Sequence, residues 1–261
     1  MNLAIILIAG RGSRLRPLTD RNPKCLIKIG DLPILGIQLT ALRKNGIKNI
    51  VLVVGYMAEK IKKYVFGNFP DLNIIFVYNT NPHTNTLYSL FLASEKIKHY
   101  YESIFLLNGD VFFDSRIIKN LKDTNQNKSY ISIQMKKCGE EEIKAILAKD
   151  GSVKFLNKEE NHEKAVGEAI GINKFSVYFW KDLTKELKHL KDEFSKEYFE
   201  YAIEKVINKG KKIFPFDIGD LNAIEIDFPK DLEVARKFIF SVAHKKGKMN
   251  QKILEKKPDK G

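Results

Sequence analysis

The chain has 261 residues and a formal net charge of +13, with 44% hydrophobic and 30% charged residues, a balance typical of a globular protein that buries a core. Its length fits one α/β domain with at most a small insertion. Cys25 and Cys138 lie far apart, which argues against a disulfide framework and a zinc site. No apolar run approaches the roughly 18 residues of a membrane span, and no segment resembles a signal peptide, so we expect a cytoplasmic protein.

Part of the positive charge lies at the C-terminus, where residues 245–261 contain seven lysines against Glu255 and Asp259. This segment has little apolar content, and we expect it to be a flexible, solvated tail after a domain that covers residues 1–244. A basic chain can bind nucleic acid, but it suits equally an enzyme whose substrates are polyanions. Because the sequence has no recognised nucleic-acid-binding fold or aromatic platform, we expect no nucleic-acid partner.

The first half of the chain alternates short apolar runs with helical segments. The runs are rich in β-branched residues, as is typical of strands buried on both faces, and they are Leu3–Ile8, Ile50–Val54, Ile74–Tyr78 and Ser103–Leu107. Helices are expected between them, with Gly46 as a C-cap of the first, at Ile34–Lys44, Ala58–Phe66 and Thr86–Ile97. This alternation predicts a doubly wound, parallel sheet with right-handed connections.

The second half predicts a hairpin and further elements around this core. The runs Ala145–Ala148 and Val153–Leu156 flank the turn signal Lys149-Asp150-Gly151. After a strand at Ala169–Asn173 we expect two helices, Phe175–Leu190 and Tyr198–Asn208, and then two short strands, Ile213–Asp217 and Ala223–Ile226. A final helix is expected from Pro229 to about Ala243. The expected fold is a Rossmann-like α/β core with a mainly parallel, mixed sheet, in which residues 136–175 form an inserted hairpin that acts as a lid.

A long loop with two glycines follows the first strand. Gly10 and Gly12 allow backbone N–H groups to approach phosphates without hindrance from a Cβ atom. A dinucleotide-binding G-x-G-x-x-G fingerprint would need a third glycine where Leu15 stands, and Arg16-Pro17 prevents a helix from following at once. No G-x-x-x-x-G-K-[ST] sequence is present, which excludes a P-loop.

The same loop carries five cationic residues, Arg11, Arg14, Arg16, Arg21 and Lys24. In a doubly wound sheet the carboxyl ends of the strands form the ligand crevice, so these side chains are expected beside a bound ligand. Cations in that position favour a triphosphate. A merely solvated basic loop would not account for the glycines and prolines placed among the charges.

These motifs together resemble the nucleotidyltransferases that activate sugar 1-phosphates and small alcohol phosphates. The resemblance covers nearly the whole chain and rests on Gly10-x-Gly12-Ser13-Arg14-Leu15, Pro17-Leu18-Thr19, Pro23-Lys24 and Gly30-x-x-Pro33-Ile34-Leu35. It implies that Arg14 and Lys24 are catalytic and bind the triphosphate. The residues that it implies for nucleotide binding are Ile8, Ala9, Gly10, Gly12, Ser13, Arg14, Lys24, Asn85, Thr86, Ser89 and Gly109. The family usually has alanine at the position of Ile8.

Two aspartates stand at predicted strand ends. Asp110 lies in Asn108-Gly109-Asp110-Val111, after the fourth apolar run, and Asp227 closes the run before Pro229. Mg²⁺ takes carboxylates together with substrate phosphate oxygens and water, so two aspartates that meet over one crevice suit it. The resemblance implies this role for Asp110 and Asp227. Considered separately, Asp110 is equally compatible with a turn and Asp227 with a helix N-cap.

The resemblance also predicts an acceptor site. Lys158, just past the hairpin, is expected to contact the acceptor phosphate, and Glu168 and Gly171 are expected to line the acceptor pocket. A plain surface role for Lys158 stays open, because lysine is abundant throughout the sequence. A quaternary ammonium acceptor would favour an aromatic cage, with Tyr88, Tyr178 or Trp180 as candidates. An amino or glycerol-type acceptor would instead favour carboxylates such as Glu168.

The segment Thr84-Asn85-x-x-Tyr88-Ser89-Leu90 indicates the subfamily. It is similar to the cytidylyltransferases for phosphocholine and 2-aminoethylphosphonate, whereas enzymes for sugar 1-phosphates usually carry a glutamine and a glycine-rich turn here. Asn85 or Thr86 would also cap the helix. The implied reaction is a Mg²⁺-dependent transfer of CMP from CTP to a small phosphate or phosphonate acceptor, with release of pyrophosphate.

Two alternative functions remain at this point. One is a sugar-1-phosphate nucleotidyltransferase that uses UTP, dTTP or CTP. The other is a non-catalytic, nucleotide-binding regulatory homologue, against which Lys24, Asp110 and Asp227 argue because binding alone does not need the full metal set. The sequence leaves open the identity of the acceptor and whether the chain forms a homo-oligomer.

Overall fold

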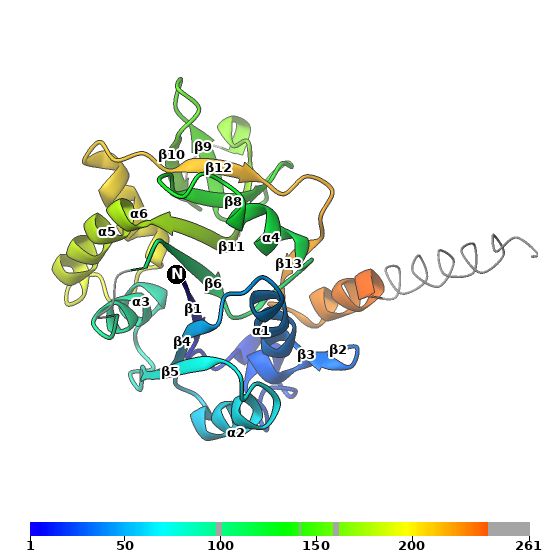
Figure 1. Ribbon diagram of the computed structural model, residues 1–261. Coiled ribbons are helices and arrows are strands. Elements are labelled where there is room, and N and C mark those ends of the chain that lie inside the picture. Colours follow the sequence, from blue (N-terminus) through cyan, green and yellow to red (C-terminus); the bar gives the residue numbers. More distant parts are fainter. Residues whose placement is uncertain (98–100, 141, 159–161, 240–261) are drawn as a thin grey trace, which may run out of the picture.

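The computed structural model describes residues 1–97, 101–140, 142–158 and 162–239, and a mixed sheet forms their centre (Figure 1). The strands follow the order β10-β9-β11-β6-β1-β4-β5, with β8 paired to β11 and β12 paired to β8. The bounds of these strands are β1 Asn2–Ile8, β4 Asn49–Val54, β5 Asn73–Tyr78, β6 Ser103–Asn108, β8 Tyr130–Gln134, β9 Lys144–Leu147, β10 Val153–Asn157, β11 Gly167–Ser176 and β12 Phe214–Asp217.

Helices cover both faces of this sheet (Figure 1). They are α1 Ile34–Lys44, α2 Ala58–Asn68, α3 Thr86–Ser94, α4 Arg116–Lys122, α5 Val177–Leu190 and α6 Phe199–Asn208, with a further helix over 229–239. Two small ribbons pair β2 Lys28–Ile29 with β3 Leu32–Pro33, and β7 Val111–Phe113 with β13 Ala223–Glu225. Short 3₁₀ turns are η1 Ser13–Leu15, η2 Lys24–Leu26 and η3 His162–Lys164.

Strand β1 accounts for the two helical layers. Successive side chains of a strand point to opposite faces, so an apolar run supplies two cores. Leu3, Ile5 and Leu7 pack in one core with α3, α5 and α6. Ala4, Ile6 and Ile8 pack in the other core with α1, α2 and α4. Strands β6, β1, β4 and β5 are parallel, and β11 is antiparallel to β6. The predicted doubly wound, mixed sheet is therefore confirmed.

The strand order reverses at β1. The chain passes from β1 to β4 and β5 on one side, then returns to place β6 on the other side of β1. In open α/β sheets, ligands bind at the carboxyl ends of the strands where the order reverses. The loop after β1 and the segment after β6 both leave the sheet at this point, where Leu7 pairs with Asn108. The fold thus brings the glycine-rich loop beside Asn108-Gly109-Asp110.

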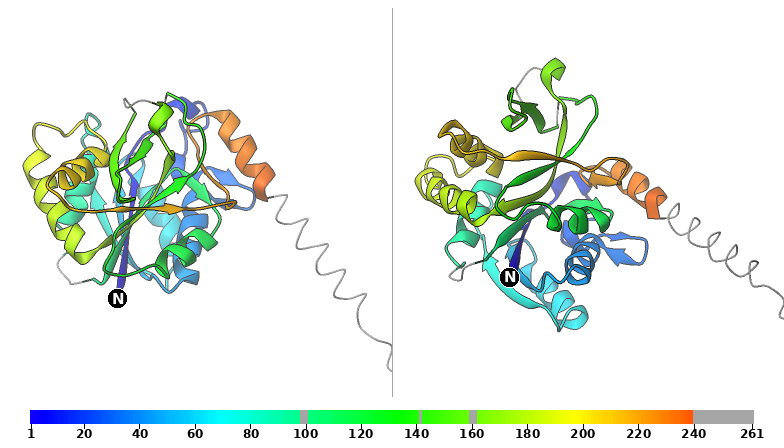
Figure 2. Two further views of the ribbon diagram at one scale, coloured as in Figure 1. Left: turned by 90° about the horizontal axis from the view of Figure 1, so that it is seen from above. Right: turned by 45° about the horizontal axis from the view of Figure 1, so that its top comes forward.

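The predicted hairpin forms from β9 and β10, with Gly151 at φ 78° in the turn. Strand β9 also pairs with Gly167 and Glu168 of β11, so the hairpin extends the central sheet. Figure 2 shows the hairpin and η3 projecting beyond the helical layers. The proposed division into a domain and a lid stays a prediction.

Several boundaries differ from those expected. Strand β11 is longer than the predicted Ala169–Asn173, because it pairs with β6, β8 and β9 in turn. Helix α3 ends at Ser94, before the expected Ile97. Neither α4 nor β8 is predicted from the sequence, because segments of seven and five residues are too short to establish a period without the core on which they pack.

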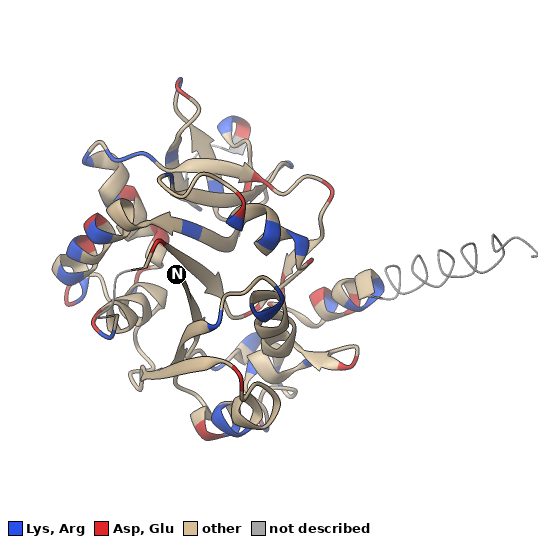
Figure 3. Cartoon of the chain, in the orientation of Figure 1, with Lys and Arg blue, Asp and Glu red and all other residues tan. Residues whose placement is uncertain are grey.

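The helix at 229–239 begins at Pro229, as predicted. Its expected continuation to Ala243 and the expected tail at 245–261 lie outside the described residues. Within the part of the chain that is described, no helix combines the length and apolarity needed to cross a bilayer. Figure 3 shows lysine and arginine residues distributed over α2, α4 and α5.

Candidate active site

Lys24 lies between the two aspartates predicted to bind Mg²⁺. Its Nζ atom donates to Asp110 Oδ2 at 2.7 Å and to Asp227 Oδ1 at 2.8 Å. Arg14 Nη1 donates to Asp227 Oδ2 at 3.1 Å. Three segments far apart in the sequence therefore meet in one ion-pair network, at the point where the strand order reverses.

Burial and charge act in opposite directions on this network. Burial lowers the pKa of Lys24, but the carboxylates of Asp110 and Asp227 more than offset it, and the net pKa is raised. Burial raises the pKa of Asp227, but Lys24 and Arg14 more than offset that effect, and the net pKa is lowered. Lys24 and Asp227 are therefore both charged at neutral pH.

Asp227 does not act as the N-cap considered for it, and the start of the last helix is instead held by the third residue of that helix, Asp231. Its Oδ2 atom accepts from the backbone N–H of Asp227 at 2.9 Å and from that of Phe228 at 2.6 Å, at the start of the last helix. The carboxylate of Asp227 faces Lys24 instead. The backbone carbonyl of Asp110 accepts from the N–H of Ile226 at 3.0 Å, which joins the segments that carry Asp110 and Asp227.

A small hydrophobic cluster anchors the glycine-rich loop. Leu15 and Ile226 are both fully buried and pack with Leu232 and Ala235 of the last helix. Leu15 is adjacent to Arg14 in the sequence, and Ile226 is adjacent to Asp227. Because fully burying each of these side chains contributes roughly 1.5–3 kcal/mol, the cluster holds the cation and the carboxylate side by side. This role of Leu15 is not predicted from the sequence.

Two glycines allow close packing at the site. Gly12 has φ 64°, and a Cβ atom there would lie 2.8 Å from Lys24 Cβ. A Cβ atom at Gly109 would lie 2.0 Å from Ile8 Cγ2 and 2.6 Å from the Leu7 carbonyl oxygen. The glycines thus let the loop lie against Lys24 and let the end of β6 lie against β1. The nearby Gly10 and Ser13 are exposed, and the carbonyl of Ala9 accepts from the N–H of Tyr56 at 3.1 Å.

The polar side chains at the start of α3 contact other protein groups. Asn85 caps the helix, as one of the two predicted alternatives, and accepts from the N–H of Thr86 at 2.8 Å. Thr86 Oγ1 accepts from the N–H of Phe199 at 3.0 Å, and Ser89 Oγ accepts from Asn79 Nδ2 at 2.9 Å. A hydroxyl that accepts one hydrogen bond can still donate one, so a contact of Thr86 or Ser89 with the nucleotide stays a prediction.

The predicted acceptor residues lie on the hairpin side of the site. The Nζ atom of Lys158 is 5.3 Å from the centre of the Tyr198 ring. The positive charge of Lys158 also lowers the pKa of Asp227, with a smaller effect than those of burial, Lys24 and Arg14. The charge of Lys158 therefore reaches Asp227, and its predicted contact with an acceptor phosphate stays a prediction. Glu168 forms an ion pair with Lys136 at 2.6 Å. Gly171 lies against the side chain of Asn108, beside Asp110.

Two glutamates at the site are missed by sequence reasoning. Burial, followed by the negative charge of Asp110, raises the pKa of Glu225 to about 8. Burial raises the pKa of Glu200 to about 7. The sequence could have indicated Glu225, because it lies two residues before Asp227 and alternate residues of an extended chain point to the same side. Glu200 had none, because nothing local distinguishes it from the many exposed glutamates.

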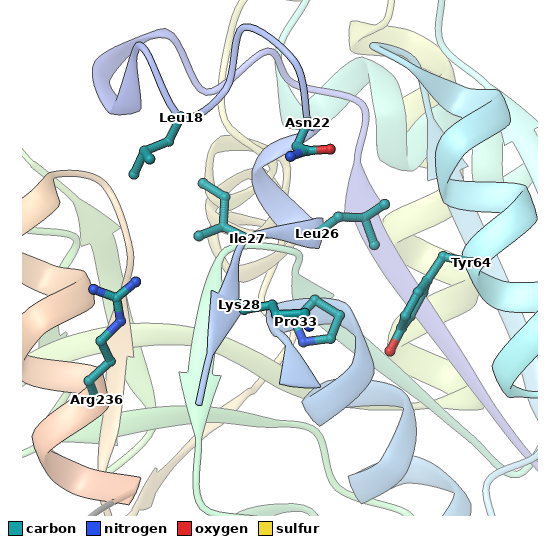
Figure 4. Close-up of a pocket in the computed structure, with 8 residues that line it drawn as sticks. All are labelled: Leu18, Asn22, Leu26, Ile27, Lys28, Pro33, Tyr64 and Arg236. Atoms are coloured by element: carbon teal, nitrogen blue, oxygen red, sulfur yellow. The ribbon is translucent and has the colours of Figure 1, made fainter. Parts of the chain in front are cut away.

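A separate hollow of about 470 Å³ lies on another side of the glycine-rich loop. Figure 4 shows Leu18, Leu26 and Ile27 lining it, together with Tyr64 and Arg236. None of its lining residues is a predicted site residue. The hollow is therefore distinct from the network around Lys24.

We expect Glu200→Gln to stabilise the protein at pH 8. Because the pKa is raised, the carboxyl of Glu200 keeps its proton in the folded state between about pH 4.5 and 7, whereas the unfolded state releases it. The free energy of unfolding therefore falls as the pH rises through this window. Removing it should add about 1–3 kcal/mol to the free energy of unfolding at pH 8 and nothing at pH 4. Urea unfolding at both pH values measures this, with the exposed Glu193→Gln as control. A loss of stability at pH 8 would contradict the prediction.

The nucleotidyl transferase family model matches residues 3–225. The chain therefore belongs to the nucleotidyl transferase family.

Two curated relatives and one solved structure indicate its neighbours within the family. A CTP:phosphoglutamine cytidylyltransferase of Campylobacter jejuni is 27% identical over 250 residues, which cover 88% of this chain and 98% of the relative. A choline-phosphate cytidylyltransferase of Streptococcus pneumoniae is 31% identical over 142 residues, which cover 53% of this chain and 56% of the relative. The structure of a CTP:phosphocholine cytidylyltransferase from Streptococcus pneumoniae has a TM-score of 0.75 to this chain at 21% sequence identity. The match covers 91% of this chain and 99% of the other chain, and it shows that the two have the same fold.

Proposed function

We propose that this chain is a Mg²⁺-dependent cytidylyltransferase that transfers CMP from CTP to a small phosphate or phosphonate acceptor and releases pyrophosphate. The observation that carries the proposal is the network of Lys24, Asp110, Asp227 and Arg14 at the reversal of strand order. The relatives from Campylobacter jejuni and Streptococcus pneumoniae, whose names specify cytidylyl transfer, support the choice of CTP.

Asp110 and Asp227 fit a Mg²⁺ ion. Their carboxylates converge on a single cation, the ammonium of Lys24, so a divalent ion nearby would find oxygen ligands from two segments. No cluster of three or more His, Cys, Asp or Glu suited to a metal occurs among the described residues. This arrangement suits Mg²⁺, which is commonly held by one or two carboxylates together with substrate phosphates and water. When bound, the ion would neutralise charge on the phosphates of CTP.

The protein's own groups align the reactants and stabilise charge. Lys24 and Arg14 provide cations for the triphosphate, and the N–H groups around Gly10 and Gly12 can approach its oxygens. Lys158 holds the acceptor phosphate for an in-line attack on the α-phosphorus of CTP. A phosphate with a second pKa of about 6 is largely anionic at neutral pH, so the reaction needs no general base.

The cytoplasm is the compartment that we propose for this activity. Cys25 and Cys138 are both free thiols, as suits a reducing environment. Burial raises the pKa of Cys25 to about 12, which keeps this thiol protonated and unreactive beneath Lys24.

Pyrophosphate release tests the proposal directly. Each of the four nucleoside triphosphates is combined with phosphocholine, phosphoethanolamine, 2-aminoethylphosphonate, glycerol phosphate and a hexose 1-phosphate, with Mg²⁺ or with EDTA. We expect release with CTP and a small phosphate or phosphonate acceptor, its loss in EDTA and its recovery when excess Mg²⁺ is added. Release with UTP or dTTP and a hexose 1-phosphate would identify a sugar-1-phosphate enzyme instead. Nucleotide binding without release in any combination would indicate a non-catalytic homologue.

A further inference from the structure

A buried glutamine on α1 holds the turn that carries Asp110. Gln38 is fully buried, and its Nε2 atom donates to the backbone carbonyl of Asn108 at 2.8 Å and to that of Val111 at 2.9 Å. These two residues lie immediately before and after Gly109-Asp110, which form the turn between β6 and β7. One side chain of α1 therefore spans the turn that carries this proposed metal ligand.

Gln38 is the exception among the buried residues of its helix. The others have no polar side chain, and they are Ile34, Leu35, Gly36, Leu39, Ala41 and Leu42. The Oε1 atom of Gln38 is buried and has no hydrogen-bond partner among the described residues. Burying an amide oxygen without a partner costs free energy, and a leucine or methionine at this position would avoid that cost. What distinguishes Gln38 from an apolar residue is therefore the pair of hydrogen bonds that Nε2 donates.

Backbone hydrogen bonds hold the same turn from two other sides. The N–H of Gly109 donates to the carbonyl of Leu7 in β1 at 3.0 Å. The carbonyl of Asp110 accepts from the N–H of Ile226, just after β13, at 3.0 Å. Gln38 adds the third contact, from a helix that packs against β7. The turn is thus anchored to β1, to the chain after β13 and to α1.

The position of this turn determines where the carboxylate of Asp110 lies. Lys24 Nζ is 2.7 Å from Asp110 Oδ2 and 2.8 Å from Asp227 Oδ1, so a small rotation of the turn would move the two carboxylates apart. Side chains that bind a metal are in general oriented by neighbouring hydrogen bonds, and loss of those bonds lowers metal affinity. The hydrogen bonds of Gln38 are suited to this task, because they hold the peptide groups on both sides of Gly109-Asp110.

We infer that Gln38 is a positioning residue for Asp110, and that its two hydrogen bonds hold the carboxylate where it can share a divalent ion with Asp227. The inference rests on the proposed function and adds to it a residue that acts only through the backbone of Asn108 and Val111. Loss of these hydrogen bonds therefore weakens metal binding, whereas the groups that bind the acceptor keep their places.

Gln38→Met tests this inference, because methionine has a similar length and no donor. We expect the Mg²⁺ concentration that gives half-maximal pyrophosphate release to rise about 10-fold, within the range for losing a group that orients a metal ligand. Turnover at saturating Mg²⁺ should stay within about 3-fold of the unmodified enzyme, because the bound ion then orders the turn. The KM of the acceptor should not change.

Metal binding is also measured without turnover. Mn²⁺ is titrated into the protein with a CTP analogue that has a methylene group between its α- and β-phosphorus atoms, and electron paramagnetic resonance follows the free ion. We expect Gln38→Met to weaken Mn²⁺ binding about 10-fold and Asp110→Ala to weaken it more. Gln38→Glu keeps the shape and, because burial favours the protonated carboxyl, one of the two donors, so its effect should be smaller.

Leu42→Ala is the matched control for a loss of stability. Leu42 is fully buried one turn after Gln38, so its truncation leaves a cavity in the core that α1 covers. We expect this variant to lower the midpoint of thermal unfolding and to leave Mn²⁺ binding unchanged. Unchanged Mn²⁺ binding in Gln38→Met, or an equal weakening in Leu42→Ala, would overturn the inference and leave cytidylyl transfer intact. If Gln38→Met does not fold, Gln38→Glu decides in the same way.

A failure of the proposed function is distinguishable from a failure of this inference. If CTP reacts with no acceptor, the proposed function fails, and Mn²⁺ titration of the nucleotide-free protein then decides the role of Gln38. Binding that is weakened in both Asp110→Ala and Gln38→Met would support the inference. Binding that Gln38→Met leaves unchanged, or no binding to the unmodified protein, would overturn it.

Discussion

Lys24→Ala is expected to reduce turnover at least ~100-fold, the loss typical of removing one preorganised electrostatic group. Lys24 is the cation closest to both Asp110 and Asp227, and its charge is stabilised by their carboxylates. Without it, the triphosphate would lose a positioned counter-charge, and Asp110 and Asp227 would lose the cation between them, although Arg14 would still pair with Asp227. Asp110→Ala should cause a loss of the same size. Steady-state pyrophosphate release with CTP and the preferred acceptor measures both.

The exposed Lys28→Ala is the matched control, because it removes the same charge from the following strand. We expect it to retain turnover within about 3-fold, in line with the small effects of exposed charges. Near-normal turnover in Lys24→Ala would contradict the assignment of this residue. A thermal unfolding curve for each variant separates a loss of chemistry from a loss of fold.

Gly109→Ala is expected to destabilise the folded state by about 1–3 kcal/mol, the range found for overpacked cores. The added Cβ would lie 2.0 Å from Ile8 Cγ2 and 2.6 Å from the carbonyl oxygen of Leu7. A side chain can move aside, but the backbone of β1 is paired on both sides and cannot. Urea unfolding should show the loss, and turnover should fall as well because Asp110 is the next residue.

Two further variants make the Gly109 result specific. Gly67→Ala, in α2, has open space around the new Cβ and should change stability by less than about 1 kcal/mol or raise it, because alanine is a better helix former than glycine. Combining Ile8→Ala with Gly109→Ala should recover part of the stability, because it removes one of the two contacts. Wild-type stability in Gly109→Ala alone would show that β1 and β6 pack more loosely than the distances indicate.

Much of the fold follows from local signals. The apolar runs of β1, β4, β5 and β6 are long enough and rich enough in β-branched residues to predict strands, and their alternation with helices predicts a parallel sheet. The prediction that all four are buried on both faces is wrong for β5, because it lies at the edge of the sheet, where Ile75 and Tyr78 are exposed. The hairpin was predictable from Asp150-Gly151, and the last helix from Pro229. Segment α4 was not predictable, because the pattern of one short helix depends on the surface beneath it.

The sequence by itself determined the cations of the glycine-rich loop, the two aspartates at strand ends and the family to which they belong. These are short-range patterns, in which residue type and spacing carry the information. The tertiary structure alone decided that Leu15 and Ile226 hold Arg14 against Asp227, and that Lys24 lies between Asp110 and Asp227. Those contacts join residues that are distant along the chain, and the burial of Glu200 arises only when α6 packs beside β10.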